Sequence, residues 1–462
     1  MHVSKYNIIL DTPEEKKNVI LNPLSGAVDI VDEEVIQFIN RIKTGENIQT
    51  EEMNSELLEA CLEKGYLFHD QTEETEKLKK AVERWYDIVR NLTERFVVYV
   101  TFGCNLKCVY CVQRETDQNR AYVISKEVTE SMFRAIDTIH KERGKKENPS
   151  LTLFGGEPLM KRKSQVEAVE EILRNCSEND YKVAIVTNGV ELSFYCDMLS
   201  KYNVKSLQVT LDGPKEVHDK RRIFANGKGT FDRIVKGIDD VLEKNIPVRI
   251  RVNIDEKNVD KLPRLARFIT EKEWLDKGAT VTLCGASEDI EECFNEPNSE
   301  IYQKVFNIYN AHPETGIMVL SLRISQVFQE ILNRGMLPFP QAQFCWSTSK
   351  VLYSMDLYGN IFPCCCMNAC CNLRELSYGR FHPKLRLNED ILEAWHCRNI
   401  FSLPQCRDCK VAPLCGGGCT RTALHYGKSL EDGVACPTAI TEKEIQTVFN
   451  YYYPQLKERV GI

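Results

Sequence analysis

Three cysteines fall within eight residues of one segment, at Cys104, Cys108 and Cys111. Thiolates at this spacing on one tight loop can bind three irons of a cubane iron–sulfur cluster and leave the fourth iron without a protein ligand. An open coordination position distinguishes a catalytic metal site from a structural one. Zinc is the alternative, but a zinc site usually has a fourth Cys or His at close spacing, and none follows here. The segment therefore indicates a catalytic iron–sulfur centre.

The length, charge and N-terminus of the chain bear on how its 20 cysteines are used. The first ten residues contain too short an apolar run for a signal peptide. No run reaches the roughly 18 apolar residues that a membrane span needs. We therefore expect a cytoplasmic protein with reduced thiols that serve as metal ligands or catalytic groups. The net charge of −7 argues against nucleic acid as a partner.

Alternating strands and helices must position the first cysteine group. Six apolar runs fit buried parallel strands, at residues 96–101, 151–154, 183–187, 206–211, 248–253 and 280–283. A helix between the fourth and fifth runs has Phe231, Ile234 and Ile238 on one face. Six βα repeats predict an α/β fold, a partial (β/α)6 TIM-like barrel with its site at the C-terminal ends of the strands.

The predicted barrel lies between two regions of different composition. Residues 1–92 are expected to form a small winged-helix-like domain of short strands and two helices, followed by a charged helix. Residues 93–283 would be the barrel, and residues 284–343 a polar, helical bridging region. Residues 344–462 would form a cysteine-rich iron–sulfur domain with a C-terminal helix, and such a domain needs metal to fold.

The loop Cys104-Asn-Leu-Lys-Cys108-Val-Tyr-Cys111 resembles the C-x3-C-x2-C signature of the radical S-adenosylmethionine (SAM) superfamily. Further motifs lie where this family has them, at successive strand ends: Phe154-Gly-Gly-Glu-Pro158, Val186-Thr-Asn-Gly189 and Val209-Thr-Leu-Asp-Gly-Pro214, the last followed by His218-Asp-Lys-Arg-Arg222. Each alone usually marks a turn, but a chance match would not supply their order.

The resemblance implies how SAM would be held. The carboxylate of Glu157 would bind the methionine amino group, and Thr210 and Arg222 would bind its carboxylate. Tyr110 would lie near the adenine. The implied cofactor-binding residues are Tyr110, Gly155, Gly156, Glu157, Asn188, Thr210 and Arg222. In the family, SAM bound to the open iron is cleaved by one electron, and the 5′-deoxyadenosyl radical removes a substrate hydrogen atom.

Seven later cysteines have the spacing of a second family element. They are Cys345, Cys364, Cys406, Cys409, Cys415, Cys419 and Cys436. The pattern resembles the SPASM extension, which holds two auxiliary 4Fe–4S clusters in radical SAM enzymes that act on peptides and proteins. The resemblance implies a first auxiliary cluster on Cys345, Cys364 and Cys419, and a second on Cys406, Cys409, Cys415 and Cys436. Three 4Fe–4S clusters and SAM are therefore the expected cofactors, and zinc ribbons are the alternative.

Five thiols occur between residues 364 and 371, and only Cys364 has a place in the SPASM spacing. The others are Cys365, Cys366, Cys370 and Cys371. One of them can fold back as a fourth ligand of the first auxiliary cluster, or the cluster keeps an open iron that binds a substrate thiolate. In extended backbone Cys365 and Cys366 would point to opposite sides, so at most one would reach the cluster. The open iron is the favoured prediction.

Peptide-maturing members of this group often carry an N-terminal winged helix, a recognition element for ribosomally synthesised and post-translationally modified peptides (RiPPs). It binds the leader segment of a precursor peptide by adding it as a strand at a sheet edge. We therefore expect an oxidoreductase that matures a precursor peptide, forming a thioether or another side-chain crosslink. A flavodoxin or ferredoxin would supply electrons.

Two other functions remain open at this stage. An anaerobic sulfatase-maturing enzyme, which generates formylglycine, would resemble this chain from the barrel onward. Such enzymes generally lack the leader-binding unit and have Asp directly after the second SPASM cysteine, where this chain has Cys365. A non-enzymatic iron–sulfur electron carrier is the third possibility, but it has no use for the Gly-Gly-Glu-Pro motif.

Overall fold

The computed structural model describes residues 1–14, 16–45, 55–111, 113, 122–202, 204–285, 299–370, 374–436 and 440–460. They form two compact units, each built from segments that are distant in sequence. We call Asn91–Ser321 with Trp346–His396 the barrel unit. We call Met1–Arg90 with Leu322–Cys345 and Cys397–Ile462 the terminal unit. Each unit takes residues from several of the four predicted consecutive domains. The division into those four domains stays a prediction.

The six predicted strands of the barrel are present and parallel, with ends that differ from the prediction by at most two residues. They are β6 (Arg95–Thr101), β7 (Ser150–Gly155), β8 (Lys182–Thr187), β9 (Ser206–Thr210), β10 (Val248–Ile254) and β11 (Thr280–Gly285). Their order in the sheet follows the chain. The α/β fold class is confirmed.

Two further parallel strands flank these six and were not predicted. β12 (Met318–Leu320) pairs with β11, and β13 (Leu352–Met355) pairs with β6. Both are short, and apolar runs of three or four residues do not stand out from loops in a sequence. β13 places residues from the predicted cysteine-rich domain beside the first barrel strand.

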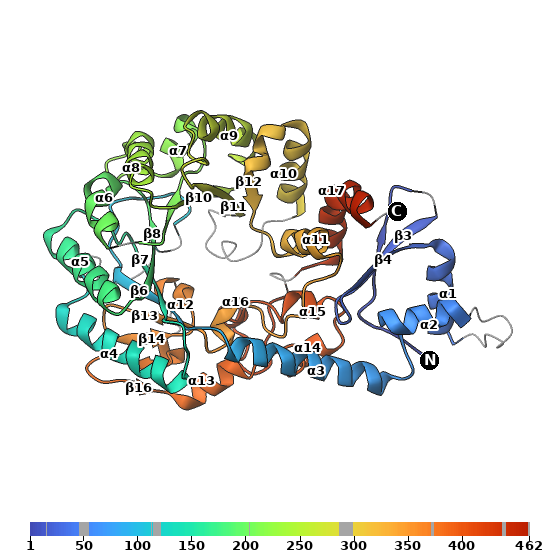
Figure 1. The fold of residues 1–462 in the computed structure, drawn as a ribbon. Helices are drawn as coiled ribbons and strands as arrows, with labels where there is room; N and C mark the ends of the chain where they lie inside the picture. Colours follow the sequence, from blue (N-terminus) through green and yellow to red (C-terminus); the bar gives the residue numbers. More distant parts are fainter. Residues whose placement is uncertain are drawn as a thin grey trace. The chain divides into compact units, whose positions relative to one another are not determined.

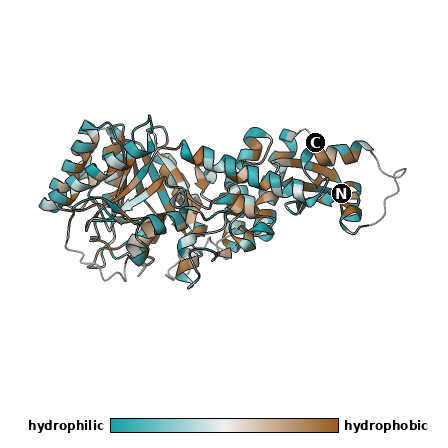
Figure 2. Cartoon of the chain, turned by 90° about the horizontal axis from the view of Figure 1, so that it is seen from below, coloured by the Kyte–Doolittle hydropathy of each residue, from teal (hydrophilic) through white to brown (hydrophobic). Residues whose placement is uncertain are grey.

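Helices follow the strands of the barrel unit and lie on the outer side of the sheet (Figure 1). They are α4 (Lys126–Arg143), α5 (Lys163–Glu178), α6 (Leu192–Lys201), α7 (Lys215–Arg221), α8 (Phe231–Glu243), η1 (Val259–Lys261), α9 (Leu262–Glu271), α10 (Ser299–Ala311) and η2 (Pro313–Ile317). Figure 2 shows hydrophobic residues along the strands and hydrophilic residues on the helices around them.

The helix α8 illustrates how the sequence pattern produces this layer. Phe231, Ile234 and Ile238 recur at helical spacing, and all three are buried. Burying each such side chain contributes roughly 1.5–3 kcal/mol. The apolar stripe therefore fixes which side of α8 faces the sheet.

An antiparallel extension completes the barrel unit. β14 (Asn360–Phe362) pairs with β13, and β15 (Gly379–Arg380) and β16 (Arg386–Leu387) continue the sheet. The remaining elements here are η3 (Trp346–Thr348), α12 (Cys365–Cys370), η4 (Arg374–Leu376) and α13 (Glu389–His396). The hydroxyl of Tyr99 on β6 donates to the carbonyl of Cys365 (2.8 Å), which anchors the start of α12 to the sheet.

The terminal unit combines both ends of the chain. Its N-terminal elements are β1 (His2–Val3), β2 (Ile8–Asp11), β3 (Lys17–Asn22), β4 (Ala27–Asp32), α1 (Glu33–Lys43), α2 (Ser55–Lys64), β5 (Leu67–Phe68) and α3 (Gln71–Arg90). Its later elements are α11 (Arg323–Arg334), α14 (Pro404–Arg407), α15 (Ala412–Cys415), α16 (Thr420–His425) and α17 (Glu442–Val460). The strand and helix order predicted for the winged-helix-like region is present.

The N-terminal region shares a hydrophobic core with the cysteine-rich segment. Tyr6, Leu24 and Phe68 pack in one buried cluster with Leu403 and Cys406. A region of about 90 residues buries little apolar surface by itself, so this shared core adds to its stability. No helix among the described residues is long and apolar enough to cross a membrane.

Candidate active site

The first cysteine loop begins directly after β6, and its backbone is held by the segment that follows α7. The N–H of Lys107 donates to the carbonyl of Ile223 (2.8 Å), and the N–H of Val109 donates to the carbonyl of Arg221 (3.0 Å). These two bonds join the C-terminal ends of the first and fourth predicted strands. The loop is therefore positioned at the end of the barrel where the sequence predicted the site.

The three thiols of the loop lie near one another. The pKa of the Cys104 thiol is raised to about 12, chiefly by burial, and the charges of Cys108 and Cys111 also raise it. Burial also raises the pKa of the Cys108 thiol. Such thiols stay protonated at neutral pH unless a metal displaces the proton. The donor set therefore suits an iron–sulfur cluster.

Two glycines at the end of β7 allow the backbone to approach this loop closely. A Cβ on Gly156 would lie 2.2 Å from the carbonyl oxygen of Gly103, and a Cβ on Gly155 would lie 2.3 Å from that of Thr101. The N–H of Gly156 donates to Thr101 O (2.9 Å), and that of Glu157 donates to Gly103 O (2.7 Å). In this structure the glycine pair fits β7 against the start of the cysteine loop.

Glu157 is buried and joins the ends of β7 and β8. Its carboxylate accepts hydrogen bonds from the N–H of Leu159 (2.8 Å), the hydroxyl of Thr187 (2.6 Å) and the N–H of Asn188 (2.6 Å). Burial raises its pKa to about 6. A carboxylate can accept about four hydrogen bonds, so one acceptor position remains for a cationic group such as the amino group of SAM.

Asn188 contacts the cysteine loop directly. Its side-chain amide donates to Asn105 Oδ1 (2.7 Å) and lies 3.8 Å from Cys104 Sγ. Its own Oδ1 accepts from the N–H of Val190 (2.9 Å). Asn188 therefore links the end of β8 to the first cysteine, a contact that the motif alone did not indicate.

The hydroxyl of Tyr110 is fixed by a partly buried polar network. It donates to Asp212 Oδ2, and it accepts from Arg222 Nη1 (2.8 Å) and Asn253 Nδ2 (3.1 Å). The guanidinium of Arg221 lies over the Tyr110 ring, 5.1 Å from its centroid. The resemblance placed Tyr110 near the adenine, and the structure adds that its hydroxyl joins the cysteine loop to β9 and β10.

Arg222 has an unsatisfied hydrogen-bond donor that a SAM carboxylate could fill. Its side chain is 7% exposed, and its Nε–H has no hydrogen-bond partner among the described residues. A buried guanidinium N–H without an acceptor is costly, and a carboxylate ligand would satisfy it. Thr210, the other residue predicted to bind the methionine carboxylate, is also buried, at the end of β9. The residues present therefore fit the carboxylate end of SAM.

A buried histidine, His218, supports the backbone of Arg222 through the hydroxyl of Thr230. His218 Nδ1 accepts from the N–H of Asp212 (3.2 Å), and its Nε2 lies 3.0 Å from the hydroxyl of Thr230. That hydroxyl donates to the carbonyl of Arg222 (2.8 Å), so Nε2 carries the proton in the assigned network. Burial keeps the pKa of His218 well below its usual value, and the ring is neutral.

Sequence reasoning gave no role to Asp212, His218 or Asn253. The first two belong to motifs that were singled out, and Asn253 lies near the end of β10. Their position at strand ends was a usable signal, because polar residues there face the site of a parallel barrel. Their hydrogen-bond partners were not predictable, since those partners come from separate βα units.

The second cysteine group lies within the terminal unit. Burial is the main cause that raises the pKa of the Cys406 thiol to about 12. The charges of Cys415, Cys409 and Cys436 raise it as well, so the other three predicted ligands lie near Cys406. Residues Gly416, Gly417 and Gly418 all have positive φ, between 75° and 93°, which lets the chain turn sharply after Cys415.

The first auxiliary set is divided between the two units. Cys345 and Cys419 belong to the terminal unit, and Cys364 belongs to the barrel unit. Their use as one ligand set therefore stays a prediction from the SPASM resemblance.

The thiols at the start of α12 lie closer together than predicted. The sulfur atoms of Cys364, Cys365 and Cys366 all lie within 4.8 Å of one another. The expectation that Cys365 and Cys366 point to opposite sides is wrong, because the backbone becomes helical at Cys365 and is not extended there. The side chain of Cys370 and all of Cys371 lie outside the described residues.

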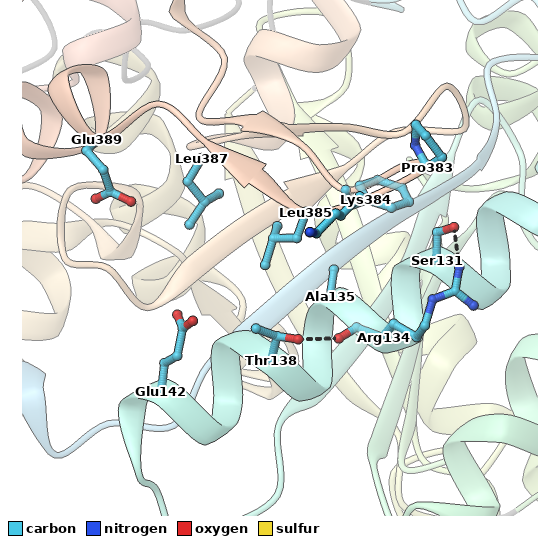
Figure 3. A pocket seen from close by; sticks show the side chains of 11 residues that line it. Ser131, Arg134, Ala135, Thr138, Glu142, Pro383, Lys384, Leu385, Leu387 and Glu389 are labelled. Carbon is cyan, nitrogen blue, oxygen red and sulfur yellow. Dashed lines mark hydrogen bonds between the residues drawn. The ribbon is translucent and has the colours of Figure 1, made fainter.

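A pocket of about 460 Å³ lies apart from these cysteines, between α4 and residues 381–389 (Figure 3). Arg134 and Lys384 line it together with Glu142 and Glu389. The guanidinium of Arg134 donates to the Ser131 hydroxyl (2.8 Å). None of the predicted site residues lines this pocket. The candidate active site remains the group of residues at the strand ends.

Changing Cys104, Cys108 and Cys111 together to Ala should abolish SAM cleavage and remove the iron of one cluster, since the three thiolates are its predicted ligands. Iron content and 5′-deoxyadenosine formation after anaerobic reconstitution measure both effects. Cys176→Ala is the matched control, because Cys176 is buried within α5 and is not a predicted ligand. Full iron content with continuing cleavage in the triple variant would contradict the assignment.

Glu157→Ala and Arg222→Ala should each weaken SAM binding. Each removes a charged partner of the methionine group, and a charge-assisted hydrogen bond contributes about 1.5–3 kcal/mol, or roughly ten- to a hundredfold in affinity. Calorimetric titration with SAM measures the change. Arg233→Ala, which removes an exposed arginine on α8 that pairs with Glu191, serves as the control. Unchanged affinity in both site variants would exclude them from SAM binding.

Single Ala variants at Cys365, Cys366, Cys370 and Cys371 should all retain three clusters. Each iron of a cubane binds its own thiolate, and sulfur atoms as close as those of Cys364 and its neighbours suit a single ion better than two corners of a cluster. Iron and sulfide analysis of each variant gives the answer. Loss of one cluster in any variant would mean full protein ligation and would exclude an open auxiliary iron.

Comparison with known proteins gives one matching family model and several relatives. The model for the radical SAM superfamily matches residues 98–269. Fe-coproporphyrin III synthase of Methanosarcina barkeri is 27% identical over 197 residues, 42% of this chain and 42% of that protein. The cysteine-type anaerobic sulfatase-maturating enzyme of Clostridium novyi is 21% identical over 346 residues, 72% of this chain and 90% of that protein. The chain spans less than half the length of the two Methanosarcina relatives it matches.

Two solved structures share the fold over most of the chain. Native anSMEcpe with bound AdoMet has a TM-score of 0.57 and 19% identity, and the match covers 79% of this chain and 98% of that one. Streptococcus suis SuiB bound to the precursor peptide SuiA has a TM-score of 0.55 and 15% identity, covering 95% of this chain and 100% of that one. At these identities the likeness concerns the fold.

The segment matched by the family model begins in β6 and includes every residue that forms the site at the strand ends. It contains the cysteine loop, the glycine pair with Glu157, and Arg222 with its network. The cysteine-rich part of the chain follows this segment, as it does in the pattern that the sequence resembles. Residues 98–269 therefore match the radical SAM superfamily, and the fold of the chain resembles the folds of anSMEcpe and SuiB.

Proposed function

We propose that this chain is an enzyme, a maturase that modifies a ribosomally synthesised precursor peptide by forming a thioether or another side-chain crosslink. The observation that carries the proposal is the small antiparallel sheet β2–β3–β4, in which the outer edge of β4 pairs with no strand of the described residues. An open sheet edge is the feature by which such units bind an extended peptide.

The β2 edge of this sheet is covered by α17. The N–H of Asp11 donates to Gln446 Oε1 (3.0 Å), and Gln446 Nε2 donates back to the carbonyl of Asp11 (3.0 Å). Lys457 and Tyr453 on the same helix both donate to the carboxylate of Glu14 (2.6 and 3.0 Å). A peptide strand therefore has better access to β4 than to β2.

The hydrogen-bonding direction of β4 identifies the groups available to a leader peptide. The N–H of Glu33 donates to the carbonyl of Lys16 (2.8 Å). Because antiparallel ladders alternate, the N–H groups of Val28 and Ile30 then point away from β3, toward the open edge. Ala27 and Val31 pack on the local core, which places Val28 and Ile30 on the other face of the sheet.

The site residues have separate tasks in the proposed reaction. SAM and the cluster on Cys104, Cys108 and Cys111, when bound, would supply radical abstraction of a hydrogen atom. Arg222 would bind the methionine carboxylate, Glu157 its amino group, and the Tyr110 hydroxyl would hold the loop. Forming a C–S bond from C–H and S–H removes two hydrogen atoms. One leaves as an atom, and the other leaves as a proton and an electron.

That electron needs an acceptor, and we propose that the two auxiliary 4Fe–4S clusters accept it. Cys406, Cys409, Cys415 and Cys436 would hold one cluster, and Cys345, Cys364 and Cys419 the other. The pKa effects among the first four thiols support their use as one ligand set. A flavodoxin or ferredoxin in the cytoplasm is the proposed source of the electron that starts the reaction.

Formation of formylglycine in a sulfatase is the second candidate, favoured by the Clostridium novyi relative, which the chain matches over 90% of that protein's length. This candidate gives no task to the open β4 edge. It also leaves unexplained the Cys365 that follows Cys364 where such enzymes have Asp. Modification of a sulfatase-derived peptide without a leader would favour it over the crosslinking maturase.

The proposal predicts that a cysteine-containing precursor, supplied with its leader, stimulates SAM cleavage and loses the mass of two hydrogen atoms. Ile30→Pro should weaken precursor binding about tenfold or more, because it removes an edge N–H and blocks strand addition. Calorimetry with the leader peptide measures the affinity, and mass spectrometry measures the product.

Ile30→Ala is the matched control, since it shortens the same side chain but keeps the N–H. Backbone pairing predicts near-normal leader affinity in this variant. A leader that binds Ile30→Pro as tightly as the unmodified protein, with an unchanged circular dichroism spectrum, would exclude the β4 edge as its binding site.

A further inference from the structure

Arg398 is a buried cation in the terminal unit that pairs with no carboxylate among the described residues. The side chain is 4% exposed. Its Nε donates to the hydroxyl of Thr420 (3.2 Å), and its two terminal nitrogens donate to the carbonyls of Leu430 and Gly433. All of these acceptors are neutral. Removing a guanidinium from water without an anionic partner costs several kcal/mol, so a negative charge nearby is expected.

Arg398 lies near Cys406, because Gly433, which accepts from its guanidinium, precedes Val434, and Val434 packs with Cys406 in one buried cluster. Burial lowers the pKa of Arg398, and the neighbouring acidic groups that act against this effect are Cys406, Asp432, Cys419 and Glu431. Asp432 and Glu431 are both exposed to solvent, which screens their charge. The cysteines differ, because Cys406 is buried and metal binding would make both of them thiolates. The anions that balance Arg398 most effectively are therefore the thiolates of a loaded iron–sulfur centre.

The hydrogen bonds of Arg398 also hold the segments that carry these ligands. Thr420 follows Cys419 directly, and residues 430–433 lead to Cys436. Gln343 Nε2 donates to the carbonyl of Arg398 (3.0 Å), which attaches the arginine to the segment before Cys345. One planar guanidinium with its fixed donor geometry thus spans two ligand-bearing segments, which a lysine cannot do.

We propose that Arg398 is a positioning residue of the auxiliary centre on Cys406, Cys409, Cys415 and Cys436, and that its charge raises the reduction potential of that centre. This inference rests on the auxiliary clusters of the proposed function. Reduction adds a negative charge to a centre that already carries four thiolates, and a buried cation stabilises the reduced form. The centre becomes a better acceptor for the electron released on crosslinking.

The test is a redox titration followed by electron paramagnetic resonance, in the full chain with Cys104, Cys108 and Cys111 changed to Ala so that only auxiliary signals remain. Arg398→Gln should lower the midpoint potential of one auxiliary centre by the equivalent of about tenfold in the reduction equilibrium, roughly 59 mV for one electron. Arg398→Lys keeps the charge and should restore most of the difference.

Arg407→Gln is the matched control, because it removes the same charge from an exposed residue next to Cys406. We expect a much smaller shift there, since solvent screens that charge. An unchanged potential in a fully loaded Arg398→Gln protein would overturn the inference. If Arg398→Gln loses the iron of that centre, the iron content and the midpoint potential of Arg398→Lys are compared with those of the background protein. Retained iron at an unchanged potential in Arg398→Lys supports the role of charge, and retained iron at a lowered potential overturns it. Loss of iron in both variants supports the positioning role.

The outcome separates this inference from the proposal on which it rests. If the background protein, before any change at Arg398, holds no auxiliary iron, the auxiliary-cluster assignment itself fails. If it holds the iron and only the effect of Arg398 is absent, the assignment stands and the inference alone is wrong.

Discussion

Buried charges that require a charged ligand are the constraint on which both functional regions depend. In the barrel unit, Glu157 and Arg222 lie buried at the strand ends, and the Nε–H of Arg222 has no acceptor among the described residues. In the terminal unit, Arg398 is held by neutral carbonyls and a hydroxyl. A fold tolerates such groups when a ligand completes them. The proposed cofactors would therefore contribute to the stability of these sites.

The barrel supplies these groups from different strand ends and joins them through short polar contacts. Glu157 binds the backbone at the end of β8, and Tyr110 connects the cysteine loop with Asp212 and Asn253. The glycine pair at 155–156 brings the β7 end into backbone contact with the residues before Cys104. Because these contacts cross between βα units, the site exists only after the sheet has assembled.

The two ends of the chain are combined in a comparable way. Tyr6 packs in the same buried cluster as Leu403 and Cys406, and α17 covers the β2 edge through Gln446. A change in the cysteine-rich segment can therefore affect the N-terminal region through their shared core. This coupling is of interest for the proposed maturase function, since it joins the proposed leader-binding sheet and a proposed cluster in one unit.

The sequence by itself determined the six parallel strands, the helix pattern and the cysteine loop, because each depends on local periodicity or on spacing within a few residues. The motifs at 104–111, 154–158 and 218–222 likewise predicted which strand ends carry the site. Only the tertiary structure decided that Tyr110 bonds to Asp212, that Cys365 begins a helix beside Cys364, and that β13 pairs with β6. Those outcomes depend on contacts between residues more than a hundred positions apart, or on a helix–strand choice that short segments leave to their surroundings.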